Sequence, residues 1–250
     1  MKICLNKITL FFITGILTLT SGAWTRSPAL EGYYSEEEVR SFYPLGSPDQ
    51  IVIRKSWYAG DRMRKDEAWL GITIARFDLD HIYILDPRAK TYIQVSPQFL
   101  RELSSQSFSA FGIQTGDGRV EFPDDLYIRT ETTKEIGFWS CYQVITNPKY
   151  RDPEAPYAVF WYSEDVDFPV QLYGDQLKQL FGNTPEVEGL FTRLRQFEGY
   201  PVRSEAHGAS QTTVTTLIKI ERRDDIDPAL FEVPPDYTEE ILDEDIQHSR

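Results

Sequence analysis

The chain has 250 residues and a formal net charge of −13, because 39 Asp and Glu outnumber 26 Lys and Arg. This acidity argues against sequence-independent nucleic-acid binding, which depends on Lys and Arg contacts to phosphates, and against adhesion to anionic membrane surfaces. The length fits one large domain or two small ones, and all-β folds of this size are commonly single.

The N-terminus has the pattern of a removable export signal. Lys2 and Lys7 precede an apolar run from Ile8 to Leu19, and small residues stand at Ser21 and Ala23. A basic start, a short apolar core and small residues two apart are typical of secretory signals, and the run is shorter than the roughly 20 residues that span a membrane. We expect cleavage after Ala23 and an exported, periplasmic, soluble protein; a buried N-terminal helix is the alternative.

Four regions follow from this pattern. Residues 1–23 form the signal peptide, 24–50 an N-terminal segment, 51–237 a single domain, and 238–250 a tail. The tail is acidic and lacks aromatic residues beyond 237, so we expect it to be mobile. No segment of the mature chain is long and apolar enough to be transmembrane.

The first half of the domain has the period-two pattern of half-buried strands. Ile51, Ile53 and Trp57 share one face of the first strand, and Asp86-Pro87 begins a type I turn. The predicted strands cover 51–57, 62–64, 70–77, 82–85 and 91–95. Ser96-Pro97 then signals a helix start, which predicts a short helix over 97–105.

The second half returns to strands after a glycine-rich loop over 104–125. Strands are predicted over 126–135, 138–146 and 157–163, and later over 200–206 and 211–222. Between these two groups, a helical section over 174–197 carries an apolar stripe that includes Leu190 and Leu194. The order predicts a mainly β protein of the α+β class.

Several motifs together resemble the DUF4412 family of uncharacterised exported proteins. They are Gly60-Asp61-Arg62-Met63-Arg64, Asp86-Pro87 with Lys90-Thr91-Tyr92, Ile136-Gly137-Phe138 before Trp139-Ser140-Cys141, Val159-Phe160-Trp161-Tyr162, Glu198-Gly199-Tyr200-Pro201, and Phe231-Glu232-Val233-Pro234-Pro235-Asp236-Tyr237. The resemblance spans roughly 50–240. Phe138 departs from the tyrosine that many relatives carry, which removes a hydroxyl.

That family looks related to the LolA/LolB type of envelope lipoprotein carriers. The resemblance implies an open antiparallel half-barrel whose concave side is covered by short helices near 97–105 and 174–197. It implies no catalytic residues.

The residues themselves form no pattern of a catalytic or metal site. His81, His207 and His248 lie far apart without metal-ligand spacing, and Gly-x-Ser-x-Gly and P-loop motifs are absent. Asp124-Asp125 and Asp224-Asp225 are better explained as solvated turns than as paired carboxylates. We therefore expect no enzyme activity, no metal and no cofactor.

Cys141 is the only cysteine after the predicted signal, so no internal disulfide can form in the mature chain. Its strand context predicts a small buried apolar residue. A reactive thiol is the alternative.

A basic group at Arg62, Arg64 and Lys65 is the best polar candidate for a ligand site. Arg62 and Arg64 fall on one face of a strand, where both could grip an anionic headgroup, carboxylate or phosphate. The alternative is a solvated hairpin in which these residues pair with local acids such as Asp66.

Aromatic residues make the stronger case for a site, although ordinary core packing is the alternative for most of them. An acyl chain gains about 0.8 kcal/mol per buried methylene, whereas an exposed ion pair contributes about 0–1 kcal/mol. The predicted ligand-binding residues are Trp57, Arg62, Arg64, Trp69, Phe77, Tyr92, Trp139 and Trp161.

These observations favour a periplasmic, non-enzymatic carrier that holds a lipid, or the acyl chains of a lipoprotein, in a concave apolar cavity. The first alternative is an interaction or scaffold module with a self-filled core, whose partner is another envelope protein. The second alternative is an unrecognised hydrolase acting through Ser, Asp or Tyr.

Overall fold

A computed structural model of the protein describes residues 28–43, 48–68, 71–98, 113–114, 120–150, 157–169, 174–175, 185–208 and 211–241. The predicted export signal and Trp69 lie outside these residues. So does most of the predicted 97–105 helix, of which residues 97 and 98 are helical, and part of the predicted 174–197 section.

Short strands dominate the structure. They are β1 (Leu30–Phe42), β2 (Gln50–Ala59), β3 (Arg62–Glu67), β4 (Gly71–Arg76), β5 (His81–Asp86), β6 (Thr91–Val95), β7 (Ile113–Gln114), β8 (Val120–Glu121), β9 (Tyr127–Ile136), β10 (Trp139–Thr146), β11 (Tyr157–Ser163), β12 (Tyr200–His207), β13 (Thr212–Ile226) and β14 (Thr238–Glu239). Helix α3 (Pro185–Leu194) and the 3₁₀ turns η1 (Phe77–Leu79), η2 (Pro148–Tyr150) and η3 (Pro228–Phe231) complete the described elements.

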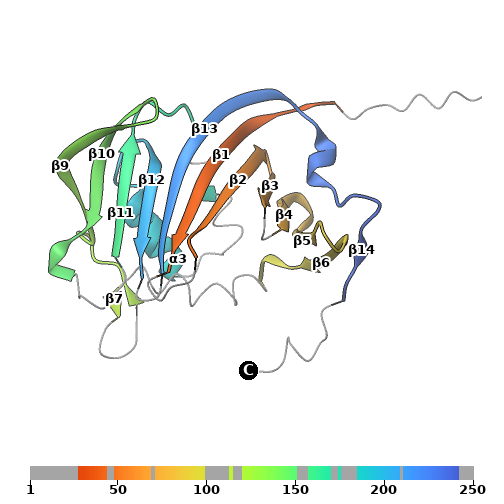
Figure 1. Ribbon diagram of the computed structural model, residues 1–250, viewed down its shortest axis with the longest axis horizontal. Helices are drawn as coiled ribbons and strands as arrows, with labels where there is room; N and C mark the ends of the chain where they lie inside the picture. Colours follow the sequence, from red (N-terminus) through yellow and green to blue (C-terminus); the bar gives the residue numbers. More distant parts are fainter. Residues whose placement is uncertain are drawn as a thin grey trace, which may run out of the picture.

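Twelve of the strands form one open sheet, in the order β14-β6-β5-β4-β3-β2-β1-β13-β12-β11-β10-β9. All neighbours are antiparallel except β14 and β6, which are parallel. Figure 1 shows the sheet bending over from β9 at one end to β14 at the other, and the two ends do not meet. The predicted mainly β class and open antiparallel sheet are therefore confirmed.

Strand β1 is an element that the sequence analysis did not anticipate, because it assigned no strand to residues 24–50. β1 pairs with β13 and with β2, so the sheet begins at Leu30 rather than at Ile51. Its sequence hides the strand period, because polar residues occupy both faces, with Ser35 and Glu37 on one and Glu36 and Glu38 on the other.

The prediction of a mobile tail is wrong for its first residues. Thr238 and Glu239 pair with β6 as β14, and the amides of Thr238 and Glu240 donate to Lys90 O at 2.9 Å and Tyr92 O at 2.8 Å. Composition could not show this pairing, because backbone groups and not side chains hold a strand at a sheet edge. The tail beyond 241 lies outside the described residues.

The sheet has two faces that the strand register defines. Directly paired residues share a face, and one paired row runs Val144, Phe160, Ser204, Thr215, Val39 and Val52. Phe160 packs with Leu190 of α3, so this side is called the helix face. On β2 it continues at Arg54, Ser56 and Tyr58, because alternate residues share a face.

The next row runs Gln143, Trp161, Arg203, Thr216, Glu38 and Ile53 and belongs to the opposite side. On β2 this side continues at Lys55 and Trp57. Trp57 packs with Leu230 and Phe231 of the chain that follows β13, so this side is called the C-terminal face.

Hairpin turns use glycine where the backbone demands it. Gly137 has φ +59° at the first central position of the Gly137-Phe138 turn between Ile136 and Trp139, the position where glycine favours a type II′ turn. Phe138 is 93% exposed at this hairpin tip. The hydroxyl that it lacks would therefore point to solvent rather than into the core.

In the described part of the chain, no helix is long and apolar enough to span a membrane.

Candidate functional site

The helix face carries one unbroken apolar row across six strands. Cross-strand pairing aligns Tyr33, Tyr58, Met63, Ala75, Ile82 and Val95 from β1 to β6. All but Tyr33 belong to the buried core, with 0–5% of their surface exposed. This row is a strip of the kind that could hold an acyl chain, because apolar burial is roughly proportional to area removed from water.

The segment that follows β11 lies on this row. The ring of Phe168 is 5.1 Å from Tyr33, 5.6 Å from Tyr58 and 5.3 Å from Tyr200, in each case edge to face. Phe168 is itself buried, at 7% exposure. A side chain of this chain therefore covers the Tyr33–Tyr58 end of the apolar row.

Helix α3 covers the other half of the helix face. Leu190 is buried against Tyr142, Phe160 and Tyr162, and Leu194 packs beside it. Arg193 fixes the helix end, because Nε donates to Phe122 O at 2.7 Å and Nη2 lies 2.7 Å from Asp124. Figure 1 shows α3 beside β11 and β12. The predicted helical cover is thus present over β10 and β11.

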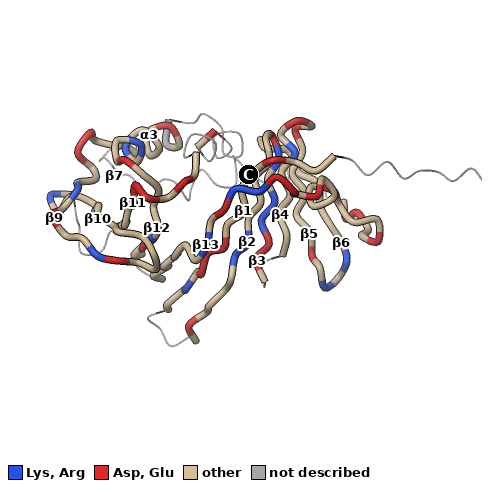
Figure 2. Tube along the Cα trace, turned by 90° about the horizontal axis from the view of Figure 1, so that it is seen from above, with Lys and Arg blue, Asp and Glu red and all other residues tan. Residues whose placement is uncertain are grey.

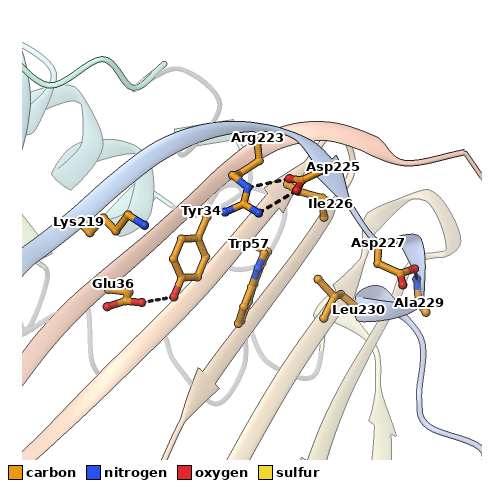
Figure 3. Close-up of a pocket in the computed structure, with 10 residues that line it drawn as sticks. All are labelled: Tyr34, Glu36, Trp57, Lys219, Arg223, Asp225, Ile226, Asp227, Ala229 and Leu230. Atoms are coloured by element: carbon orange, nitrogen blue, oxygen red, sulfur yellow. Dashed lines mark hydrogen bonds and ion pairs between the residues drawn. The ribbon is translucent and has the colours of Figure 1, made fainter.

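The C-terminal face carries a groove of about 590 Å³. The rings of Tyr34 and Trp57 lie in it 5.1 Å apart, and Ile226 and Leu230 add apolar surface (Figure 3). Glu36, Lys219, Arg223, Asp225 and Asp227 supply its charges. The groove is therefore an aromatic surface with a charged rim.

The charged rim is paired internally. Arg223 donates to both oxygens of Asp225, at 2.7 and 2.9 Å, and to Glu221 at 2.8 Å, and Lys219 lies 2.9 Å from Glu221. Tyr34 donates to Glu36, and desolvation followed by this carboxylate raises the pKa of the phenol. The rim cations are thus matched by neighbouring carboxylates and leave the aromatic rings as the main contact surface.

Arg64 and Arg62 lie on one face of β3, as predicted, but they serve different partners. Arg64 binds Asp66 through two nitrogens, at 2.7 and 3.0 Å, and Leu230 O at 3.0 Å. Arg62 lies 3.5 Å from Asp78. The structure engages both arginines in internal contacts on the C-terminal face.

The described aromatic residues of the predicted site fall into two core clusters. Trp57 and Tyr92 pack under the C-terminal segment, and Tyr92 also lines a smaller pocket of about 310 Å³ beside the Asp86 turn. Trp161 is buried in the same core cluster as Tyr58 and Phe168, and Trp139 and Phe77 pack against that cluster. Phe77, Trp139 and Trp161 therefore share the core cluster of the apolar row, whereas Trp57 and Tyr92 do not.

Trp161 has an unusual environment. It is 6% exposed, its indole N–H has no hydrogen-bond partner, and the amine of Lys134 lies 3.7 Å from the ring centroid. A cation over a tryptophan face is attracted by the ring quadrupole. This contact anchors the β9–β10 hairpin to β11.

The other predicted polar residues have structural partners. Asp125 binds Lys149 and accepts from Tyr150 at 2.8 Å, which lowers the pKa of its carboxyl group, and Asp225 pairs with Arg223. His207 stacks on Tyr157 with ring centroids 4.3 Å apart. Over the described ranges, no group of three His, Cys, Asp or Glu residues could hold a metal ion.

Cys141 is buried at 1% exposure, and desolvation is the main cause that raises the pKa of its thiol. The structure thus places it as a small core residue, as the sequence predicts.

Residues of the helix face were the main omission of the sequence analysis. Tyr58, Ile82 and Phe168 were not among the predicted site residues, although they form or cover the apolar row. Alternation along β2 separates Tyr58 from Trp57, but it does not tell which of the two faces a helix covers.

No protein-family model and no curated protein matches the chain. The resemblance to DUF4412 therefore stays a prediction.

Solved structures similar to this chain include a LolA superfamily protein from Nitrosomonas europaea, with 10% identity, a TM-score of 0.33, and coverage of 81% of this chain and 91% of that one. A DUF1329 family protein from Desulfovibrio piger has 12% identity, a TM-score of 0.35, and coverage of 81% and 90%. An outer membrane lipoprotein-sorting protein domain from Vibrio parahaemolyticus has 7% identity, a TM-score of 0.31, and coverage of 80% and 89%. At these scores the likenesses carry no argument about function.

Proposed function

We propose that this protein is an exported, non-enzymatic carrier that holds a lipid or the acyl chains of a lipoprotein against the helix face of its sheet. The observation that carries the proposal is the apolar row from Tyr33 to Val95, which crosses six strands with the hydroxyls of Tyr33 and Tyr58 as its polar groups. A chain of ten methylenes laid along such a strip would gain about 8 kcal/mol before the costs of binding.

Phe168 takes the place of the ligand in the proposed empty state. Its ring touches Tyr33 and Tyr58, where an acyl chain would lie. The carrier would therefore load by moving the segment that carries Phe168 away from the sheet. Lid movements of this kind are common in proteins that enclose their ligands.

The proposal is tested by the intact mass of the protein after extraction from its native envelope, and by displacement of a fluorescent fatty acid from the purified protein. We expect a bound lipid mass and displaceable binding. Phe168→Ala should bind the fatty acid several-fold more tightly, because the ligand no longer competes with the ring, whereas Leu79→Ala, at a 48% exposed position, should leave binding unchanged. Bare polypeptide mass in every preparation, together with no displacement, would contradict the proposal.

A second candidate function is an interaction module for another envelope protein. This function is favoured by the burial of Met63, Ala75 and Ile82, which are 0–2% exposed. Such burial beneath the chain's own side chains is typical of a core that leaves no room for a ligand. Cross-linking to an envelope protein by a preparation that carries no lipid would support this function over the carrier.

A further inference from the structure

Two polar rows lie beside the apolar row on the helix face. The nearer row aligns Ser35, Ser56, Lys65 and Thr73 across β1 to β4, and the next aligns Glu37, Arg54 and Glu67. Successive rows on one face of a strand are about 7 Å apart. The helix face therefore changes from apolar to polar to charged over a short distance. An amphiphile has the same order of polarity from its hydrocarbon chain to its head group.

The charges of the row formed by Glu37, Arg54 and Glu67 pair with one another. Arg54 lies between two carboxylates, with Nη1 3.4 Å from Glu37 and Nε bonded to Glu67. These three side chains are 16–24% exposed. Both carboxylates thus form ion pairs with Arg54.

The nearer row holds two donors that make no hydrogen bond. Lys65 is partly buried, and within the described chain its amine forms neither a hydrogen bond nor an ion pair. Ser56 pairs directly with Lys65 across β2 and β3, is 1% exposed, and its hydroxyl has no partner. The Ser56 hydroxyl lies close to the phenol of Tyr58 without the geometry of a hydrogen bond.

A buried donor without a partner is costly, and the Ser56 hydroxyl is one. Desolvation, and then the nearby Arg54, lower the pKa of Lys65, and Glu67 and Glu37 offset this in part. Buried polar groups in proteins are nearly always paired, and each exception calls for an explanation. An anionic oxygen bound between Ser56 and Lys65 would satisfy both donors at once.

We propose that Ser56 and Lys65 form the headgroup site of the carrier, which takes the carboxylate or phosphate of an amphiphile whose chain lies along Tyr58, Met63 and Ala75. This site rests on the carrier function proposed above and restricts its ligands to anionic amphiphiles. A cationic head is disfavoured, because the carboxylates nearest to the site already bind Arg54.

The site is tested by competition of dodecanoate, dodecyl phosphate and dodecanol against a fluorescent fatty acid on the full mature chain. We expect the two anionic ligands to bind about tenfold or more tightly than dodecanol, as a charge-assisted hydrogen bond provides. Lys65→Met should abolish that preference without weakening dodecanol, and Lys65→Arg should retain it. Lys55→Met, an exposed lysine on the other face of β2, is the matched control.

A second measurement uses only the wild-type protein. Acetylation of Lys65, followed by peptide mass spectrometry, should be slowed by dodecanoate or dodecyl phosphate and not by dodecanol. Protection by inorganic phosphate alone would identify a free anion, rather than a lipid head, as the occupant.

The outcomes separate the two proposals. The headgroup site would be overturned if all three ligands bound equally and Lys65→Met did not change their binding. It would also be overturned if dodecanoate did not slow acetylation of Lys65. The carrier function would stand in either case. Absence of binding by any ligand with an acyl chain would overturn the carrier and the site together.

Discussion

Arg64 and Leu230 are joined by a hydrogen bond of 3.0 Å, from Nη1 of the arginine to the carbonyl oxygen of the leucine. This bond ties β3 to the chain after β13, and the same guanidinium lies 5.8 Å from the ring centroid of Trp57. The arginine predicted to orient a ligand thus holds the C-terminal segment against the sheet.

Replacement of Arg64 by methionine should lower the free energy of unfolding by about 1–3 kcal/mol, because Leu230 O loses its donor and Asp66 loses a bidentate partner. Urea unfolding followed by tryptophan fluorescence measures the change. Arg222→Met is the control, since Arg222 and its partner Glu31 are 67% and 72% exposed, and it should change stability by less than about 0.5 kcal/mol. Equal effects of both variants would show that the Leu230 contact contributes nothing.

Phe231 is fully buried at 0% exposure between the C-terminal segment and the sheet. Phe231→Ala should cost about 3–5 kcal/mol, the usual range for loss of a core phenylalanine. The same variant should increase amide exchange at Thr238 and Glu240, whose amides bond to Lys90 and Tyr92. Exchange that stays slow at these two amides would show that β14 is held independently of Phe231.

Gly32 lies where β1 passes close to β2. A Cβ atom at this position would stand 2.0 Å from Tyr58 O, so Gly32→Ala must push two backbones apart and should cost more than about 2 kcal/mol. Gly60→Ala is the matched control, because Gly60 has φ +55° but open space around it and its cost should stay near 1 kcal/mol. Thermal unfolding of both variants gives the comparison, and a Gly32→Ala protein as stable as Gly60→Ala would be the contrary result.

The lowered pKa of Lys65 predicts a rise of stability with pH. Between that lowered value and the 10.5 of a free lysine, the unfolded chain binds more protons than the folded one, so the unfolding free energy increases as pH rises. Arg54, Glu37 and Glu67 are the charges that face this amine. Urea unfolding measured at rising pH values below 10.5 should show the rise in the wild type and a smaller one in Lys65→Met.

Tyr58 sets the upper limit of that experiment. Burial raises its pKa to about 12, so above pH 10 the unfolded phenol ionises first and stability falls again. A pH profile that is identical in the wild type and in Lys65→Met would contradict the assignment of the rise to Lys65.

The thiol of Cys141 should react about a hundredfold more slowly with a disulfide reagent in the folded protein than in the denatured chain, because it is buried and its pKa is raised. Absorbance of the released thiolate measures the rate. Fast reaction under native conditions would revive the alternative of a reactive thiol.

Local patterns were sufficient to predict most of the strands. Asp86 accepts hydrogen bonds from the amides of Arg88 at 2.7 Å and Ala89 at 3.1 Å. The turn between β5 and β6 is therefore stabilised by its own residues and can be predicted from them. The hairpin at Gly60 is equally local, with φ +55°. Short-range chemistry of this kind is visible in a sequence without any knowledge of the fold.

The site depended on relationships that a sequence does not show. Alternation places Trp57 and Tyr58 on opposite faces, but only the packing of α3 and Phe168 reveals that Tyr58 faces the cover. Likewise, Ser56 and Lys65 become neighbours through the β2–β3 register, and that both lack partners follows only from three-dimensional packing. Arg64 was the more obvious cation in the sequence, yet Lys65 is the one whose amine forms no ion pair with a described residue.

An unclosed sheet leaves its outermost strand open to recruitment by another polypeptide. The edge strand β9 presents Glu131, Lys134 and Glu135 together with threonines, all exposed at positions 131–135, and Figure 2 shows basic and acidic residues along it. Ionic groups at a free edge discourage a foreign strand from adding, since their charges would have to be stripped of water. Two copies of the protein would thereby avoid joining through β9.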